Sequence, residues 1–162
     1  MTMNILSINP RNCDGCGDCE NACSEKYSGI QDKSRSRIHV VGGNGHGRLF
    51  VPFTCRQCDD PPCMAVCQNS AIYKDENLNR ILIDPNKCVG CKMCFSTCPF
   101  GAIGFDATRG YAFKCDLCGG DPECVRACTK EAITYVQGHE LKNARLHESA
   151  KKQYTVIRNQ AW

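Results

Sequence analysis

Short apolar runs, rather than long amphipathic stretches, dominate the pattern of hydrophobic and polar positions along this chain. The run Arg37-Ile38-His39-Val40-Val41 is followed by a glycine-rich segment, 42–47, and then by a second run, Leu49-Phe50-Val51. Two runs rich in β-branched or aromatic residues and separated by glycines predict a β-hairpin. We expect two more extended segments, at 81–83 and at 110–113.

Three apolar pairs follow cysteines at a fixed distance. Ala71-Ile72, Ala102-Ile103 and Ala132-Ile133 each lie four to five residues after a cysteine. We expect short helical turns to carry those cysteines and the pairs to cover them. The tail is expected to be partly helical over 140–154. The pattern predicts an α+β fold of short strands and helical turns with little conventional core.

Cysteine supplies 16 of the 162 residues, a density typical of a disulfide scaffold or of metal sites. The first ten residues, MTMNILSINP, contain neither a basic segment nor the apolar stretch of a secretion signal. No run approaches the ~20 apolar residues of a membrane span. We therefore expect a cytoplasmic protein without a membrane span, and in that compartment cysteines indicate metal binding rather than disulfides.

The sixteen cysteines fall into four groups of four with none left over. Groups one and three have the spacing C-x2-C-x2-C-x3-C, group two has C-x2-C-x4-C-x3-C, and group four has C-x2-C-x5-C-x3-C. The groups are Cys13, Cys16, Cys19 and Cys23; Cys55, Cys58, Cys63 and Cys67; Cys88, Cys91, Cys94 and Cys98; and Cys115, Cys118, Cys124 and Cys128.

The positions of the groups reveal an internal duplication. Group three lies 75 residues after group one at all four cysteines, and group four lies 60 to 61 residues after group two. Ile8-Asn9-Pro10 before group one matches Ile83-Asp84-Pro85 before group three. We expect one domain over 1–136, built from duplicated units of about 5–72 and 80–136 with a hairpin insert of about 25–52. The segment 137–162 is expected to be a tail that docks a partner.

The spacing favours [4Fe–4S] clusters, each of which needs four thiolate ligands. The run from Cys88 to Pro99 matches the bacterial ferredoxin signature, including its proline. Structural zinc prefers two separated C-x2–4-C pairs, so groups two and four alone would also suit zinc. Groups one and three, with three cysteines in seven residues, do not fit zinc. All sixteen cysteines are present, and we expect four cubes.

The formal net charge of +3 would suggest a nucleic-acid partner only for the metal-free chain. Four oxidised clusters with four thiolates each, at roughly −2 per site, would bring the loaded protein to about −5. A nucleic acid is therefore not expected as a partner.

These motifs resemble the four-cluster, ferredoxin-like electron-transfer subunits of complex oxidoreductases. The resemblance covers about Ile5 to Val136 and includes four complete motifs in the family's order. The family accompanies molybdenum or tungsten pterin enzymes such as formate dehydrogenase and dimethyl sulfoxide reductase, and also hydrogenases and carbon monoxide dehydrogenases. The chain is most similar to the small iron–sulfur subunit of tungsten-dependent aldehyde oxidoreductases. The resemblance implies tandem bacterial-ferredoxin-like modules, each with two [4Fe–4S] clusters.

The resemblance also implies a nested pairing, in which the last cysteine of each group ligates another group's cluster. The duplication by itself equally permits a sequential pairing of group one with two and of three with four. The nested sets are Cys13, Cys16, Cys19 and Cys128 for cluster 1; Cys55, Cys58, Cys63 and Cys98 for cluster 2; Cys88, Cys91, Cys94 and Cys67 for cluster 3; and Cys115, Cys118, Cys124 and Cys23 for cluster 4.

The implied function is an electron relay without catalysis of its own. The expected partners are a catalytic subunit, of the tungsten or molybdenum pterin type, and a flavin subunit or ferredoxin. Alternatives are a free polyferredoxin that shuttles between enzymes, or the corresponding subunit of a hydrogenase or carbon monoxide dehydrogenase. Self-association through the ends of the relay is also conceivable.

Basic residues near the four groups are candidates for tuning the cluster potentials. Arg11, Arg56, Lys92 and Lys114 would stabilise a reduced, more negative cluster if they lay close to it. The chain also departs from the family pattern, because Ser24, Gln68 and Thr129 stand where a proline often follows the last cysteine. We expect these departures to change local hydrogen bonding more than ligation.

Overall fold

The computed structural model describes residues 4–42 and 49–138. Most of the predicted glycine turn, the predicted helix at 140–154 and nearly all of the proposed docking tail lie outside these residues. The helices are α1 (Asp18–Ser28), α2 (Pro62–Ala65), α3 (Met93–Thr97) and α4 (Glu123–Arg126). The strands are β1 (Asn4–Ile8), β2 (Ile38–Gly42), β3 (Phe50–Thr54), β4 (Ile72–Asp75), β5 (Arg80–Ile83), β6 (Ile103–Asp106), β7 (Tyr111–Lys114) and β8 (Ile133–Gln137).

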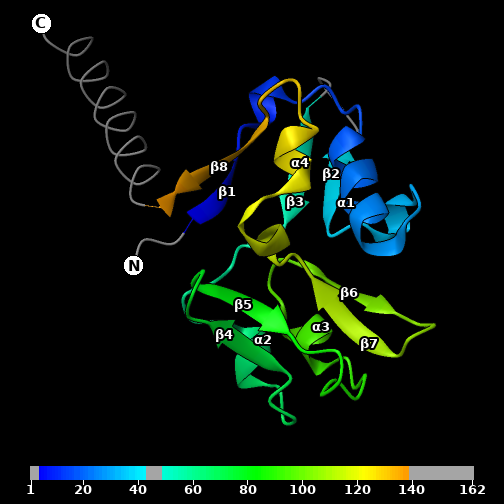
Figure 1. Cartoon of the computed structure of the whole chain (residues 1–162), viewed down its shortest axis with the longest axis vertical. Coiled ribbons are helices and arrows are strands. Elements are labelled where there is room, and N and C mark those ends of the chain that lie inside the picture. Colours follow the sequence, from blue (N-terminus) through cyan, green and yellow to red (C-terminus); the bar gives the residue numbers. More distant parts are fainter. Residues whose placement is uncertain (1–3, 43–48, 139–162) are drawn as a thin grey trace, which may run out of the picture.

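The described strands pair only as antiparallel ribbons of two: β1 with β8, β2 with β3, β4 with β5, and β6 with β7. This confirms the α+β class. The upper part of the molecule contains β1, β2, β3, β8, α1 and α4, and the lower part contains β4 to β7, α2 and α3 (Figure 1). The first and last described strands therefore close one part of the molecule together.

Two small hydrophobic cores correspond to these two parts. One contains Leu6, Ile38, Leu117 and Ile133 with several cysteines, and the other contains Ile72, Ile81, Ile103 and Ala112 with Cys94. Each core combines residues from both duplicated sequence units. Much of the buried apolar surface is cysteine, so cysteine-bound groups would complete the interior.

The duplicated sequence segments form the same backbone arrangement twice. The Asn9 N–H donates to the Ala132 carbonyl at 2.9 Å, and the equivalent Asp84 N–H donates to the Ala71 carbonyl at 2.7 Å. The side chains of Asn9 and Asp84 also each accept a hydrogen bond from the backbone N–H two residues later. The strand before group one (β1) thus pairs with the strand after group four (β8), and the strand before group three (β5) pairs with the strand after group two (β4).

The predicted hairpin is confirmed, since β2 and β3 pair over five residues. The extended segments expected at 81–83 and 110–113 are β5 and β7. The three apolar pairs do more than cover cysteines, because Ile72, Ile103 and Ile133 are the first residues of β4, β6 and β8. In the described part of the chain, no helix is both long and apolar enough to cross a lipid bilayer.

The helix α1 is longer than the helical turns expected at the last cysteines. Pro99 cannot continue α3, which ends at Thr97. Ser24 follows Cys23 instead of proline, so α1 continues to Ser28 and enters the segment expected as an insert. The Ser24 side chain is fully buried; its hydroxyl donates to the Asn21 carbonyl at 3.0 Å and accepts from the Asp32 N–H at 3.1 Å.

Candidate metal centres

Each cysteine group begins in a loop whose backbone bends through left-handed conformations. In group one, Gly15 and Gly17 have φ of 81° and 82°, and at the equivalent positions of group three Gly90 and Lys92 have φ of 70° and 62°. Such bends let three cysteines of one loop face a common centre. The third cysteine of each group then lies in a helix, from α1 to α4.

The thiols of group two enclose a cavity together with one cysteine from group three. Its lining includes the four cysteines Cys55, Cys58, Cys63 and Cys98, with the apolar side chains of Ile81 and Ile103 and with Lys114. Burial and the neighbouring thiols Cys55 and Cys98 raise the pKa of Cys58. No cysteine outside this set lines the cavity.

A second cavity has the complementary composition. The cysteines that line it are Cys88, Cys91 and Cys94 of group three and Cys67 of group two, beside Ala71, Ile72, Ile83 and Ala112. Burial, with smaller contributions from the thiols of Cys88, Cys91 and Cys67, raises the pKa of Cys94.

The remaining eight cysteines come from the two ends of the described chain. Burial, Glu20, and the thiols of Cys128 and Cys16 raise the pKa of Cys19 to about 12. Cys13 begins the same loop as Cys16. The structure thus brings cysteines of group one close to the last cysteine of group four.

The thiols of group four lie close to the last cysteine of group one. Burial and the neighbouring thiols of Cys115, Cys23, Cys118 and Cys19 all raise the pKa of Cys124. Since Cys124 lies near Cys19 and Cys115 lies near Cys55, the group-four thiols are neighbours of the thiols of group one and of group two.

The thiol sets suit polynuclear clusters better than single ions. Within 4–42 and 49–138, no three His, Cys, Asp or Glu side chains converge closely enough to hold one metal ion. Zinc requires its sulfur ligands within about 2.3 Å. Sets of four thiols around a shared cavity match the ligand number of an iron–sulfur cube.

Several donors point at cysteine sulfurs, as expected where the sulfur carries negative charge. Two of them are backbone amides: the Arg37 N–H donates to Cys23 Sγ at 3.3 Å, and the Ala112 N–H donates to Cys88 Sγ at 3.5 Å. The other two are side chains: the Tyr27 hydroxyl donates to Cys118 Sγ and the Lys114 ammonium donates to Cys55 Sγ, each at 3.5 Å. Sequence reasoning named only Lys114 of these donors.

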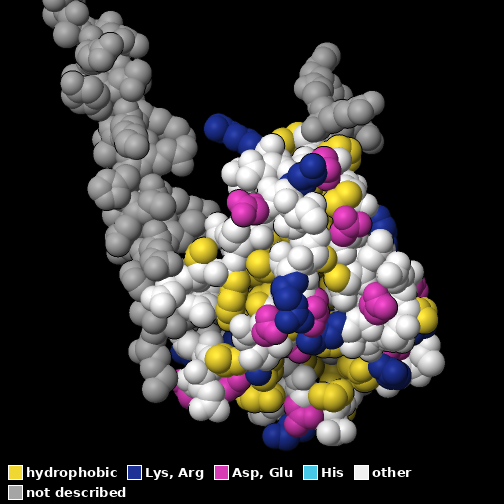
Figure 2. Space-filling view, turned by 45° about the horizontal axis from the view of Figure 1, so that its top comes forward, with side chains coloured by type: hydrophobic (Ala, Val, Ile, Leu, Met, Phe, Trp, Pro, Cys, Tyr) yellow, Lys and Arg dark blue, Asp and Glu magenta, His cyan; other side chains and the backbone are white. Residues whose placement is uncertain are grey.

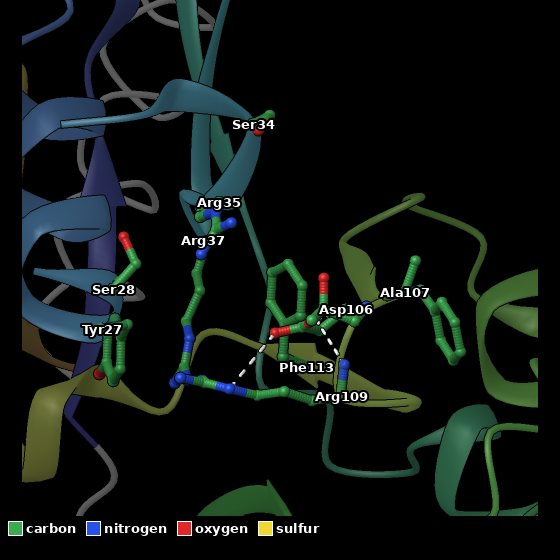
Figure 3. A pocket seen from close by; sticks show the side chains of 11 residues that line it. Tyr27, Ser28, Ser34, Arg35, Arg37, Asp106, Ala107, Arg109 and Phe113 are labelled. Carbon is green, nitrogen blue, oxygen red and sulfur yellow. Dashed lines mark hydrogen bonds and ion pairs between the residues drawn. The ribbon is translucent and has the colours of Figure 1, made fainter. Parts of the chain in front are cut away.

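A polar groove without cysteines lies beside the group-four thiols. Its lining includes Tyr27, Arg37 and Arg109, and Figure 3 shows Arg37 beside Tyr27 with Asp106 and Arg109 across the groove. Arg37 pairs with Asp116 at 2.9 Å and lies 3.3 Å from the centre of the Tyr27 ring. Although burial opposes it, the Tyr27 hydrogen bond and the Arg37 guanidinium hold the pKa of Asp116 below its ordinary value.

The other candidate basic residues, Arg11, Arg56 and Lys92, are exposed. Arg56 borders the group-two cavity and Lys92 borders the cavity of Cys88, Cys91 and Cys94. On the face in Figure 2, acidic and basic side chains are interspersed rather than separated by sign. The His39 side chain is half exposed, and its Nδ1 lies 3.9 Å from Glu20 Oε1.

Short paired strands with cysteine-rich loops that enclose thiol-lined cavities define an iron–sulfur protein of the ferredoxin-like class. Residues 47–138 match the family model described as "4Fe-4S dicluster domain". The chain belongs to this family and binds iron–sulfur clusters.

Relatives place the chain among ferredoxin-like subunits of oxidoreductases. It is 39% identical to the NADH-dependent phenylglyoxylate dehydrogenase subunit beta of Aromatoleum evansii, over 85% of this chain but only 31% of that subunit, so it spans about a third of that relative's length. It is 37% identical to the aliphatic sulfonate oxidoreductase, polyferredoxin-like subunit of Pyrococcus furiosus, over 83% of this chain and 78% of that one. It is 34% identical to the probable anaerobic dimethyl sulfoxide reductase chain YnfG of Escherichia coli, over 83% and 74%.

A solved structure supports the fold. A chain of the active site complex BamBC of benzoyl coenzyme A reductase, with 1,5-dienoyl-CoA, superposes with a TM-score of 0.50 over 84% of this chain and 76% of that one, at 22% identity. The family match and the relatives confirm the expected class: the chain is a ferredoxin-like electron-transfer subunit.

Proposed function

We propose that the chain relays single electrons through four [4Fe–4S] clusters between a catalytic subunit and a second redox partner. The observation that carries the proposal is the composition of the two thiol-lined cavities. Each is lined by three cysteines of one group and the last cysteine of another. Both sets equal those of the nested pairing, and neither fits a sequential one.

The proposed ligand sets follow the same rule for the two remaining clusters. Cys128 lies close to Cys19, and Cys23 lies close to Cys124, as the nested pairing requires. Cluster 1 would then be held by Cys13, Cys16, Cys19 and Cys128; cluster 2 by Cys55, Cys58, Cys63 and Cys98; cluster 3 by Cys67, Cys88, Cys91 and Cys94; and cluster 4 by Cys23, Cys115, Cys118 and Cys124.

The neighbouring thiols support an order along the relay. Cys19 near Cys124 joins cluster 1 to cluster 4, and Cys115 near Cys55 joins cluster 4 to cluster 2. The thiol set of cluster 3 lies next to that of cluster 2, because α2 and α3 pack against each other. Cys63 in α2 lines the cavity of cluster 2, and Cys94 in α3 lines that of cluster 3. When bound, each cluster supplies a site that takes up and gives back one electron.

The protein's own residues hold and insulate these sites. Buried aliphatic side chains such as Ile72, Ile81 and Ile103 exclude water from the inner cavities, and backbone amides donate to cysteine sulfurs. Exposed thiols occur only near the two ends of the proposed order: among the sixteen cysteines, Cys16 and Cys91 are the exposed ones. We propose that electrons enter and leave beside these two residues.

The proposed catalytic partner is of the tungsten or molybdenum pterin type, and the other partner is a flavin subunit or ferredoxin. The names of the sulfonate oxidoreductase and dimethyl sulfoxide reductase relatives support an oxidoreductase complex. The segment 137–162 remains the proposed docking tail, since its sequence carries Lys142, Arg145, Lys151, Lys152 and Arg158.

Anaerobic purification of the native protein with its partners, followed by metal analysis, tests the proposal. We expect about 16 irons per chain, four for each cluster. Fewer than about 12 irons, or stoichiometric zinc, would contradict the four-cluster assignment. Tungsten or molybdenum in a co-purifying subunit would support the partner class, whereas a stable chain without partners would favour a free polyferredoxin.

A further inference from the structure

The side chain of Lys114 is buried where the two parts of the molecule meet. Lys114 is the last residue of β7 and directly precedes Cys115, the first cysteine of group four. The residue is only 4% exposed. Its ammonium nonetheless lies toward group two, 3.5 Å from Cys55 Sγ, and it lines the cavity formed by Cys55, Cys58, Cys63 and Cys98.

Neutral groups position this ammonium without neutralising it. Nζ donates to the Cys115 carbonyl at 3.0 Å and to Gln57 Oε1 at 3.4 Å. Gln57 is itself fixed, because its amide donates to the Cys115 carbonyl at 2.7 Å and its oxygen accepts from the Ile81 N–H at 2.8 Å. The amide network therefore holds Nζ beside the thiols of group two.

Among the residues that the structure describes, Lys114 forms no ion pair with a carboxylate. A buried, unpaired ammonium is costly, so a nearby negative charge is needed to balance it. The available negative charge is that of the thiolates and of what they bind. Consistent with this, Lys114 opposes the effect of burial on the pKa of Cys63.

The duplication supplies an internal comparison. Thr54 precedes Cys55 as Lys114 precedes Cys115, and it is buried to the same degree. The Thr54 hydroxyl lies close to the Cys115 thiol and donates to the Arg37 carbonyl at 2.8 Å. Two equivalent side chains thus cross toward each other's cysteine, but only the one facing group two is a cation.

The charged pair beside the group-four thiols, Arg37 and Asp116, does not create a matching positive site there. Asp116 is paired with Arg37, so these two charges largely cancel. The lining of the group-two cavity contains two basic residues, Lys114 and the exposed Arg56, and no carboxylate. Of these two cations only Lys114 is buried, so water screens its charge least.

We propose that Lys114 raises the midpoint potential of the cluster held by Cys55, Cys58, Cys63 and Cys98 above that of its neighbour on Cys115, Cys118, Cys124 and Cys23. This rests on the proposed function. Taking up one electron adds one negative charge to the thiolate-bound site, and a cation in a buried environment stabilises that charge strongly. An electron shared between these two neighbouring clusters would then reside mainly on the group-two cluster.

The test is a redox titration with dithionite, followed by EPR spectroscopy, of the anaerobically purified holoprotein and its K114M, K114R and K74M variants. In K114M we expect the midpoint potential of one cluster to fall. Measured at the wild-type midpoint potential, its ratio of reduced to oxidised protein should be at least tenfold lower than in the wild type, which corresponds to a shift of about 59 mV for one electron. K114R should restore the wild-type value. Lys74 is exposed on β4, and K74M should change no midpoint.

A C58S variant identifies the cluster whose midpoint potential shifts, because Cys58 belongs only to the group-two set and its replacement alters the signal of that cluster alone. If K114M loses iron, K114Q replaces it, since glutamine keeps a donor without the charge. Unchanged midpoints in a fully loaded neutral variant, a shift confined to the group-four cluster, or iron loss in both neutral variants would overturn the proposal. A wild-type protein without four clusters would instead contradict the proposed function.

Discussion

At the scale of single residues, Gly90 shows why one position between two cysteines must be glycine. Its φ is 70°, and a Cβ atom there would lie 2.6 Å from the Gly110 carbonyl oxygen. Both the left-handed backbone and the close approach of the neighbouring hairpin exclude a larger residue. The loop that carries Cys88 and Cys91 thus depends on a backbone contact with the β6–β7 turn.

We predict that Gly90→Ala destabilises the protein by about 1–3 kcal/mol and weakens the third cluster first. Gly101→Ser is the matched control. Gly101 also has a positive φ, but a Cβ atom there would have no neighbour within 4 Å, and Ser70 and Glu131 occupy equivalent positions at φ of 50° and 52°. Denaturant unfolding and iron content measure both variants. Equal losses in the two would argue against the Gly110 contact.

Lys114 illustrates how far single residues can be judged from sequence. Arg11, Arg56, Lys92 and Lys114 are equal candidates by their distance from cysteines along the chain. The structure leaves three of them exposed and buries only Lys114, whose ammonium lies 3.5 Å from Cys55 Sγ. One sequence feature does distinguish Lys114: its hydrogen-bond partner Gln57 is polar, whereas the equivalent position in the other unit is the apolar Leu117.

At the scale of elements, α1 departs from its counterpart because of one residue after its last cysteine. The Ser24 N–H lies inside α1 and its hydroxyl ties the helix to Asp32. This bond connects the group-one helix to the loop that leads into β2. The longer helix therefore positions the hairpin beside the group-four thiols.

We predict that introducing the family's proline, Ser24→Pro, destabilises the protein by about 3 kcal/mol, because proline removes a helical N–H and clashes with the preceding turn. Ser24→Ala removes only the two hydroxyl hydrogen bonds and should cost about 1–2 kcal/mol. Thermal unfolding of the holoproteins compares them. A proline variant as stable as the alanine variant would show that α1 need not continue beyond Cys23.

Sequence patterns predicted some elements and not others for a physical reason. The β2–β3 hairpin joins neighbouring segments and carries its own glycine turn, so its signal is local. By contrast, β1 and β8 pair across more than a hundred residues, and each has only a few apolar positions. Their partner is set by the tertiary fold, which short runs such as Ala132-Ile133 do not reveal.

At the scale of the whole molecule, the two ends of the described chain form one structural part with the hairpin between them. The β1–β8 ribbon and the contact of α1 with α4 hold these ends together (Figure 1). Cysteine spacing correctly suggested iron–sulfur sites, but the spacing of a duplicated sequence is compatible with either pairing. The two pairings differ in which thiols share a cavity, and that depends on the fold rather than on the spacing.

The pairing leads to a counting prediction with the double variant Cys19→Ala/Cys128→Ala. In the nested arrangement both residues serve cluster 1, so three intact [4Fe–4S] clusters should remain by spin quantification of the reduced protein. In a sequential arrangement they serve two clusters, and only two would remain. Cys19→Ala/Cys98→Ala is the control, because either arrangement leaves two. Three clusters in the first variant and two in the second would establish that Cys128, 109 residues from Cys19 in the sequence, completes the site of group one.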